Sequence, residues 1–365
     1  MQTYEKLQGE FDLTTIAPHQ GTFDPSSIQI PRETLWCPIQ AQVPFERERR
    51  KWQAARDFLT GETHSFCGMV DRLKGYDIVH VKDQPFCFSY EAALAKRKHG
   101  AKLVVTQMEN IAFLNDHKFM ERQIKATVRE QADLFLAGSE GAKEALIQEG
   151  VREEKIRRIS NAVDTGYFRP GKSDLALREK LGIPKNAFVI LYVGRLAELK
   201  GIVSLLSAFE MLAAKDDLAH LVLVGKDEWG VADWAKGKGL EGQVHLAGFV
   251  PYTEMPTYYR SSSVLVLPSL PTKGNQEQFG YVLAEAMACG VPAVGSRCGA
   301  IPEVIGDESR IFTPGDPESL LEALRPLRKG LSAAQRRALR ERACKLYSTQ
   351  VLVKNIASAY RELLK

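Results

Sequence analysis

Short apolar runs alternate with longer amphipathic stretches along most of this chain. In the first half, the apolar runs that predict buried strands are residues 11–17, 77–81, 101–106, 133–137 and 155–159. The stretches with the apolar spacing of helices are residues 45–73, 90–99, 118–131 and 141–149. Strands that alternate with helices predict a parallel sheet covered by helices on both faces.

The alternation restarts after a turn-rich connector near residue 170. The strands predicted in the second half are residues 188–193, 220–224, 244–246, 264–267 and 292–295. The fold class is therefore α/β, with two doubly wound, Rossmann-like domains. We place the first domain at residues 1–170 and the second at 171–345, and we expect the C-terminal helix, 346–365, to pack back toward the first domain.

Composition limits the class of protein. A chain of 365 residues is long enough for two domains with separate cores. The net charge is +4 and the basic residues are spread out, so nucleic-acid binding is not expected. No apolar stretch approaches the roughly 20 residues of a membrane-spanning helix, and we expect no signal peptide. The six cysteines lack the spacing of a zinc site, so we expect buried, reduced thiols in a cytoplasmic protein.

Polar residues follow the predicted strands of the first half, at the ends where parallel sheets bind ligands. They are His80, Lys82, Asp83, Glu109, Asn110 and Ser139. Glu109 and Asn110 come directly after a strand, so we expect them to face a cleft. His80 is also a candidate, and a structural, hydrogen-bonded histidine is its alternative. Residues 46–52 form a basic cluster with an aromatic residue, which is typical of a solvated helix face or of a membrane-surface contact.

A glycine and two cations follow the first strand of the second half. Gly194 ends that strand and allows a ligand to approach the backbone. Arg195 and Lys200 lie in the loop that precedes the next helix. Arginine binds phosphate with two parallel hydrogen bonds, and lysine provides a point charge. Alone, the two cations favour a solvated turn; combined with an amide-lined helix start later in the same domain, they favour a diphosphate site.

A loop and an apolar helix follow the buried run at 264–267. Glu277 lies in the loop, and Glu285 lies on the helix eight residues later. The unpaired backbone N–H groups of the helix start lie between them, and the helix dipole attracts an anion there. Two solvated glutamates are the alternative interpretation.

These segments occur in the order of a known family. Along the chain they read SNAVD, VGRLAELKG, HLAGFVP, VLVLPS, EQFGYVLAE and GAIPEVI. The chain thereby resembles the retaining glycosyltransferases of the GT-B fold, family 4, whose donor domain is similar to that of glycogen synthase. The resemblance covers nearly all of the chain from Ala101 onward and is strongest in the second half. It implies transfer of a hexose from a nucleotide-diphosphate sugar, such as a UDP- or GDP-sugar, to a hydroxyl acceptor, without a metal or a cofactor.

The resemblance also implies residue roles. Arg195 and Lys200 would hold the donor diphosphate, and Glu277 would lie beside the sugar, so these three are the expected catalytic residues. Glu285 would accept hydrogen bonds from the ribose. The remaining donor-binding residues implied are Gly194, Phe249, Val250, Gln278, Phe279, Gly280 and Tyr281. The candidates on the acceptor side are His80, Glu109 and Asn110.

Two departures from the family fall in the first half. Met108 stands where the family commonly has a histidine, and the glycine-rich turn after the first strand is absent. We expect either that the first strand is missing or that this domain is built differently. Alternatives are therefore a sugar-nucleotide-binding subunit with impaired catalysis, and an epimerase of the same two-domain shape. We expect a glycan or glycolipid acceptor, polysaccharide or glycolipid assembly, and a peripheral contact with the inner face of the membrane; the oligomeric state stays open.

Overall fold

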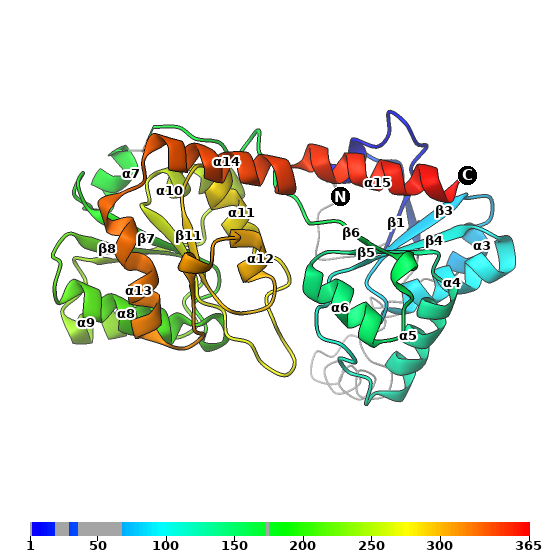
Figure 1. Cartoon of the computed structure of the whole chain (residues 1–365), viewed down its shortest axis with the longest axis horizontal. Helices are drawn as coiled ribbons and strands as arrows, with labels where there is room; N and C mark the ends of the chain where they lie inside the picture. Colours follow the sequence, from blue (N-terminus) through cyan, green and yellow to red (C-terminus); the bar gives the residue numbers. More distant parts are fainter. Residues whose placement is uncertain (1, 19–28, 36–67, 173–174) are drawn as a thin grey trace, which may run out of the picture. The chain divides into compact units, whose positions relative to one another are not determined.

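The computed structural model describes residues 2–18, 29–35, 68–172 and 175–365, and the chain forms two compact units (Figure 1). Unit 1 consists of Met1–Ser160 and Leu352–Lys365, and unit 2 consists of Asn161–Val351. In this division the connector residues 161–170 belong to unit 2, and Val163 and Phe168 are buried in its core. The basic cluster predicted at 46–52 lies outside the described residues.

Unit 1 contains a parallel sheet with the strand order β3-β4-β5-β6. Its strands are β3 (Ile78–Lys82), β4 (Lys102–Gln107), β5 (Leu134–Ala137) and β6 (Ile156–Arg158). Its helices are α1 (Gln2–Glu5), α3 (Met69–Arg72), α4 (Cys87–His99), α5 (Phe119–Gln131), α6 (Glu140–Gln148) and α15 (Thr349–Leu363), which belongs to unit 1 from Leu352. A separate parallel pair is formed by β1 (Thr15–Pro18) and β2 (Arg32–Leu35). The absence of the family's first strand stays a prediction.

The two faces of the unit 1 sheet are covered by different helices. Side chains alternate along a strand, so Leu103 and Val105 face α4, α5 and α6. Val104 faces the other way and packs against Ile356 and Tyr360 of α15. Figure 1 shows α15 on the opposite side of this sheet from α4 and α5. The C-terminal helix therefore completes the core of unit 1.

Unit 2 contains a parallel sheet of six strands in the order β12-β11-β10-β7-β8-β9. Its strands are β7 (Phe188–Val193), β8 (Ala219–Val224), β9 (Val244–Gly248), β10 (Val264–Leu267), β11 (Ala293–Ser296) and β12 (Ile311–Phe312). Its α-helices are α7 (Leu175–Lys180), α8 (Ile202–Ala213), α9 (Val231–Lys238), α10 (Met255–Arg260), α11 (Tyr281–Ala288), α12 (Ile301–Ile305), α13 (Pro317–Leu324) and α14 (Ala333–Tyr347). Two Rossmann-like α/β domains with parallel sheets confirm the predicted fold class.

Helices bury both faces of the unit 2 sheet. Ile190 and Tyr192 of β7 pack toward α8, α9 and α13, and Val189 and Leu191 pack toward α10, α11, α12 and α14. In Figure 1 these two groups of helices lie on opposite sides of the sheet. Because both faces are buried, the strands are continuous apolar runs, which is why the sequence revealed them clearly.

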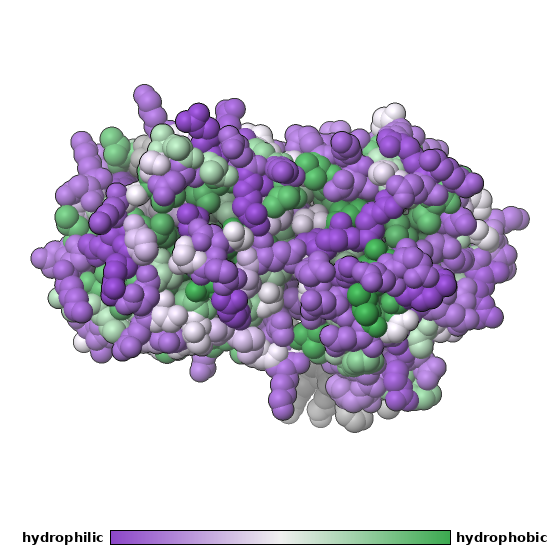
Figure 2. Space-filling model, in the orientation of Figure 1, coloured by the Kyte–Doolittle hydropathy of each residue, from purple (hydrophilic) through white to green (hydrophobic). Residues whose placement is uncertain are grey.

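The surface is mostly polar. Figure 2 shows a largely hydrophilic face on which apolar residues appear in small groups. Among the described residues, no helix has both the length and the apolar character needed to cross a bilayer.

Candidate functional site

The candidate site lies at the edge of the unit 2 sheet where the strand order reverses. From β7 the chain proceeds outward through β8 and β9, and then returns to the other side of β7 to form β10. Loops that leave neighbouring strands in opposite directions open a crevice beyond their carboxyl ends, and such crevices bind ligands in doubly wound sheets. The loops after β7 and β10 carry the two cations and Glu277 singled out in the sequence.

Glu277 and Lys200 meet at this strand reversal, although they are 77 residues apart in the sequence. The Lys200 Nζ lies 3.3 Å from Oε2 of Glu277. The Ser269 hydroxyl donates to the same carboxylate oxygen at 3.0 Å. Ser269 is buried, and its carbonyl accepts from Ser296 Oγ at 2.5 Å, which fixes the loop after β10. A cation, a carboxylate and a hydroxyl are thus joined across two loops.

Close packing of the two loops keeps this distance short. Gly201, at the start of α8, has φ 74°, a left-handed conformation that favours glycine. A Cβ at this position would lie 1.8 Å from the carbonyl oxygen of Pro268. Only glycine lets the loop that carries Lys200 touch the loop that leads to Glu277.

Arg195 is more exposed than Lys200. Its side chain is 63% exposed, against 30% for Lys200, and its guanidinium lies 3.2 Å from Glu228. The Tyr192 hydroxyl donates to the carbonyl of Arg195 at 2.6 Å. Burial raises the pKa of Tyr192, the charge of Glu277 raises it further, and Arg195 opposes the rise. Glu277 and Arg195 therefore both act on the Tyr192 hydroxyl.

The loop after β10 leads into α11 through Gly280, which has φ 77°. Glycine has no side chain that could cap a helix, so the start of α11 has no side-chain cap; of its first-turn N–H groups, that of Leu283 donates to the carbonyl of Gly280 at 2.9 Å. Phe279 is buried against Tyr281 and Tyr347, so only its backbone can serve a ligand. The Tyr281 side chain is exposed. These positions fit the anion-binding helix start that the sequence predicts.

Glu285 lies on α11 and is only 6% exposed. The Tyr259 hydroxyl donates to its Oε2 at 2.5 Å, and Tyr252 also donates to the carboxylate. Burial raises the pKa of Glu285, and the two tyrosine hydrogen bonds oppose that rise. Neither of these tyrosine hydrogen bonds to Glu285 was predicted from the sequence.

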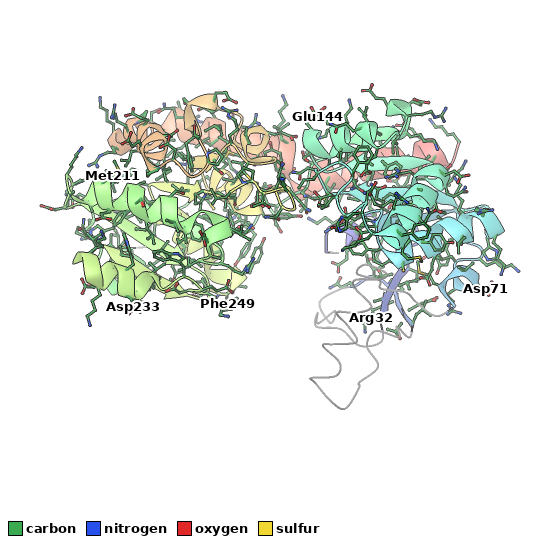
Figure 3. All side chains as sticks on the ribbon, turned by 90° about the horizontal axis from the view of Figure 1, so that it is seen from below. Arg32, Asp71, Glu144, Met211, Asp233 and Phe249 are labelled. Atoms are coloured by element: carbon green, nitrogen blue, oxygen red, sulfur yellow. The ribbon has the colours of Figure 1, made fainter. Side chains whose placement is uncertain are left out.

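Phe249 and Val250 follow β9 and differ sharply in exposure. Val250 is buried, whereas Phe249 is 87% exposed. Figure 3 shows Phe249 at the border of unit 2, with its side chain pointing outward. The loop therefore presents one aromatic ring to solvent while Val250 anchors it in the core.

On unit 1, the loop after β4 is held by its own side chains. Glu109 accepts from the backbone N–H groups of Asn110 at 2.9 Å and Ile111 at 3.0 Å. Asp83 accepts from the N–H of Met108 at 2.7 Å and has φ 57°. Burial raises the pKa of Asp83. Glu109 and Asn110 thus lie at the carboxyl edge of β4 as expected, in a loop shaped by Asp83.

His80 makes two side-chain hydrogen bonds inside unit 1. Its Nδ1 lies 2.5 Å from the Tyr360 hydroxyl, and its Nε2 lies 2.7 Å from the Thr106 hydroxyl. Burial lowers its pKa to about 4. His80 therefore links β3 to α15, which corresponds to the structural alternative. Ser139 is likewise structural, because its hydroxyl caps α6 by accepting from the N–H of Ala142 at 3.1 Å.

Two glutamines at the carboxyl edge of the unit 1 sheet were missed in the sequence. Gln107 ends β4 and Gln84 follows β3, and both are buried. Within the described part of the chain, Oε1 of each has no hydrogen-bond partner. The Gln84 Nε2 donates to Glu149 at 2.5 Å. Their position directly after apolar strands is the signal that could have identified them.

Family models match both halves of the chain. The model described as "Glycosyltransferase Family 4" matches residues 12–167, and the model described as "Glycosyl transferases group 1" matches residues 173–345. The chain is 30% identical to D-inositol 3-phosphate glycosyltransferase 1 of Catenulispora acidiphila, over 71% of this chain and 66% of the relative. A second relative, from Thermobifida fusca, is 31% identical over 48% of this chain and 42% of its own length. The chain therefore spans less than two thirds of these relatives.

Solved structures share the fold at low sequence identity. A glycosyltransferase from Rickettsia africae superposes with a TM-score of 0.77 at 19% identity. The match covers 100% of this chain and 93% of the Rickettsia chain. Anabaena Alr3699/HepE in complex with UDP gives a TM-score of 0.70 at 23% identity, over 91% of this chain and 86% of its own. With the parallel sheets, the crevice at the strand reversal and both family matches in agreement, this chain belongs to the family 4-like glycosyltransferases of the GT-B fold.

Proposed function

We propose that this protein transfers a sugar from a nucleotide-diphosphate sugar to a hydroxyl acceptor, with retention of the anomeric configuration. The observation that carries the proposal is the contact of Lys200 and Ser269 with Glu277 at the strand reversal of unit 2. It places a fixed cation beside a carboxylate and an uncapped helix start, as a sugar diphosphate requires. Similarity to proteins named as glycosyltransferases, and to a fold solved with UDP, supports it.

The first part of the proposed mechanism is stabilisation of the leaving nucleoside diphosphate. Lys200 supplies a partly buried charge, Arg195 an exposed one, and the first-turn amides of α11 supply dipoles. Charges fixed before the reaction cost no reorganisation while the glycosidic bond breaks. On this basis we propose a reaction that does not depend on a divalent cation.

The second part concerns the sugar. We place Glu277 beside the sugar ring, where its carboxylate binds hydroxyls and counters positive charge at the anomeric carbon. Ser269 and Lys200 hold that carboxylate in one orientation. The acceptor hydroxyl attacks the face from which the diphosphate departs and gives its proton to the leaving phosphate. We propose a hexose as the transferred sugar.

The nucleotide occupies the remaining positions of unit 2 in this proposal. Glu285 accepts hydrogen bonds from the ribose, and the segment Phe249–Val250 flanks the base. An exposed aromatic ring offers any base a stacking surface, so it does not select one nucleotide.

The acceptor side is assigned to the carboxyl edge of the unit 1 sheet. Glu109 and Asn110 lie there, and the unpaired amide oxygens of Gln84 and Gln107 require hydrogen-bond donors. Hydroxyl groups of a glycan or glycolipid are donors of this kind. Assembly of such a product at the cytoplasmic face of a membrane, with peripheral contact, completes the proposal.

The test is a donor screen. The protein is incubated with labelled UDP-, GDP- and ADP-hexoses, with and without mixed glycan and glycolipid acceptors, and products are separated by mass and anomeric configuration. We expect transfer, or slow hydrolysis, with one nucleotide preferred and the configuration retained. An inverted product contradicts the retaining mechanism. Epimerised donor, or tight nucleotide binding without any reaction, supports instead the epimerase or the binding-subunit alternative.

A further inference from the structure

The carboxylate of Glu285 lies between two tyrosine hydroxyls that reach it from a different part of unit 2. Tyr259 belongs to α10, and Tyr252 belongs to the 3-10 turn Tyr252–Glu254 just before that helix. Tyr259 is 0% exposed, and its hydroxyl lies 2.5 Å from Oε2 of Glu285. Tyr252 also donates to the carboxylate but is 56% exposed. The same chemical contact is thus made once in the core and once at the surface.

An aromatic cluster fixes the position of both rings. Phe168, which is fully buried, packs edge-on against Tyr259 at a centroid distance of 5.8 Å and against Tyr252 at 5.2 Å. Tyr167 stacks on Tyr252 at 6.1 Å, and its hydroxyl donates to the carbonyl of Thr253 at 2.5 Å. Tyr259 therefore has little freedom to move its hydroxyl away from Glu285, because the ring is enclosed on all sides.

We propose that Tyr259 is the positioning residue of the nucleotide site: its hydroxyl holds the Glu285 carboxylate in the orientation that receives the ribose hydroxyls. The inference rests on the proposed function. A carboxylate has about four acceptor positions, so the two tyrosines leave room for a ribose diol. An otherwise mobile glutamate is thereby fixed before the donor arrives, which lowers the ordering cost of binding.

Tyr259 also favours the ionised state of Glu285. Burial raises the pKa of this carboxyl, and the hydrogen bonds from Tyr259 and Tyr252 lower it. Tyr281 at the start of the same helix and Cys289 directly after its end also interact with the carboxylate, and burial raises the pKa of both. The other charged groups around this cluster are Asp164, Arg260 and Arg340. Loss of the Tyr259 hydroxyl removes one lowering contact, so the pKa of Glu285 should rise.

The test compares Tyr259→Phe with two variants that make the same chemical change. Tyr252 is 56% exposed, so in Tyr252→Phe water can replace the lost hydroxyl. In Tyr258→Phe the lost hydroxyl belongs to the neighbouring residue on α10, whose pKa is raised by burial and by Glu254. Binding of free UDP, GDP and ADP is measured by calorimetry between pH 5 and 8, with kcat and KM for the preferred donor and the melting temperature.

For Tyr259→Phe we expect nucleotide affinity and donor KM to worsen about tenfold, with kcat little changed, because the ribose contact is made equally in the ground and transition states. The acid limb of the affinity profile should move to higher pH. Tyr252→Phe should have a smaller effect, and Tyr258→Phe should bind nucleotide as the natural protein does.

Unchanged nucleotide affinity and pH profile in Tyr259→Phe, with only a lower melting temperature, would show a purely structural tyrosine and overturn the inference. The variant Glu285→Gln distinguishes a failure of the ribose role of Glu285 from a failure of the proposed function. If wild type binds a nucleotide and Glu285→Gln binds it equally well, the ribose role of Glu285 is wrong. If wild type binds none of the three nucleotides, the proposed function itself fails.

Discussion

Each of the two parallel sheets has a glutamate in a loop at its carboxyl edge, but the two glutamates have different partners. At the edge of unit 2, Glu277 contacts Lys200 on the loop after β7 and Ser269 on its own loop after β10. At the edge of unit 1, Glu109 turns back to cap the next two N–H groups of its own loop. The first carboxylate thus joins a cation from another loop, and the second fixes the shape of its own loop. A carboxylate after a strand is therefore informative only once its partner is known.

The comparison is tested most strongly by Glu277→Gln. The change keeps the shape but removes the charge that faces Lys200, and we expect kcat for sugar transfer to fall about 100-fold or more, roughly 3 kcal/mol of transition-state stabilisation. Affinity for the free nucleoside diphosphate should change little. Transfer assays and calorimetry on the same preparation measure both quantities.

Glu308→Gln is the matched control for this prediction. Glu308 is an exposed carboxylate that pairs with Arg297 at 2.5 Å, so its loss should leave transfer unaffected. Full activity in Glu277→Gln would show that the carboxylate at the unit 2 edge only holds its loop together.

The variants Lys200→Met and Arg195→Met compare how much each cation contributes to kcat/KM. Lys200 is the less exposed, contacts Glu277 and is held by the close approach at Gly201. We expect kcat/KM to fall by about 100-fold for Lys200→Met and by about tenfold or less for Arg195→Met, because solvent screens the exposed charge. Equal losses would mean that Arg195 leaves Glu228 and binds the diphosphate directly.

The candidate residues at the edge of the unit 2 sheet were easier to predict from the sequence than those at the edge of the unit 1 sheet, for a physical reason. Arg195, Lys200 and Gly280 follow apolar strands or begin a helix, so local patterns identify them. His80 could not be assigned, because its partner Tyr360 lies 280 residues away on α15. The bond from Tyr259 to Glu285 was missed for the same reason, since 26 residues and a strand separate the two. Strand predictions succeeded where both faces are buried, as in β7, which begins and ends at the predicted residues.

His80→Gln tests the structural assignment on the unit 1 side. The pKa of His80 is lowered from 6.5 to about 4 in the folded chain. As pH falls from 6.5 to 4, the unfolded chain takes up a proton that the folded chain excludes, so stability falls in this window by about 1–3 kcal/mol. A glutamine does not titrate, so denaturant unfolding of the variant should depend less on pH over this range.

The corresponding change at the exposed His117 should leave the pH dependence of stability as it is in the natural protein. Donor KM and kcat should also be unchanged in His80→Gln. A kinetic defect with normal stability would contradict the structural role and would indicate that His80 contributes to the acceptor site.

Gln107→Leu should have the smallest effect, and it should act in two directions. Removing a buried amide oxygen that lacks a partner should stabilise the fold by about 1 kcal/mol. If acceptor hydroxyls bind this edge, the acceptor KM should rise severalfold while the donor KM stays constant. A gain in stability without any change in acceptor KM would remove Gln107 from the acceptor side.

The most direct measurement of the central claim is a double-mutant cycle on kcat/KM with Lys200→Met, Glu277→Gln and the double variant. Lys200 and Glu277 lie 3.3 Å apart, so they should act on one donor as a unit. We predict that the double variant loses far less than the product of the two single losses, a coupling on the order of 1–3 kcal/mol. Losses that multiply independently would contradict a single divided donor site at the strand reversal of unit 2.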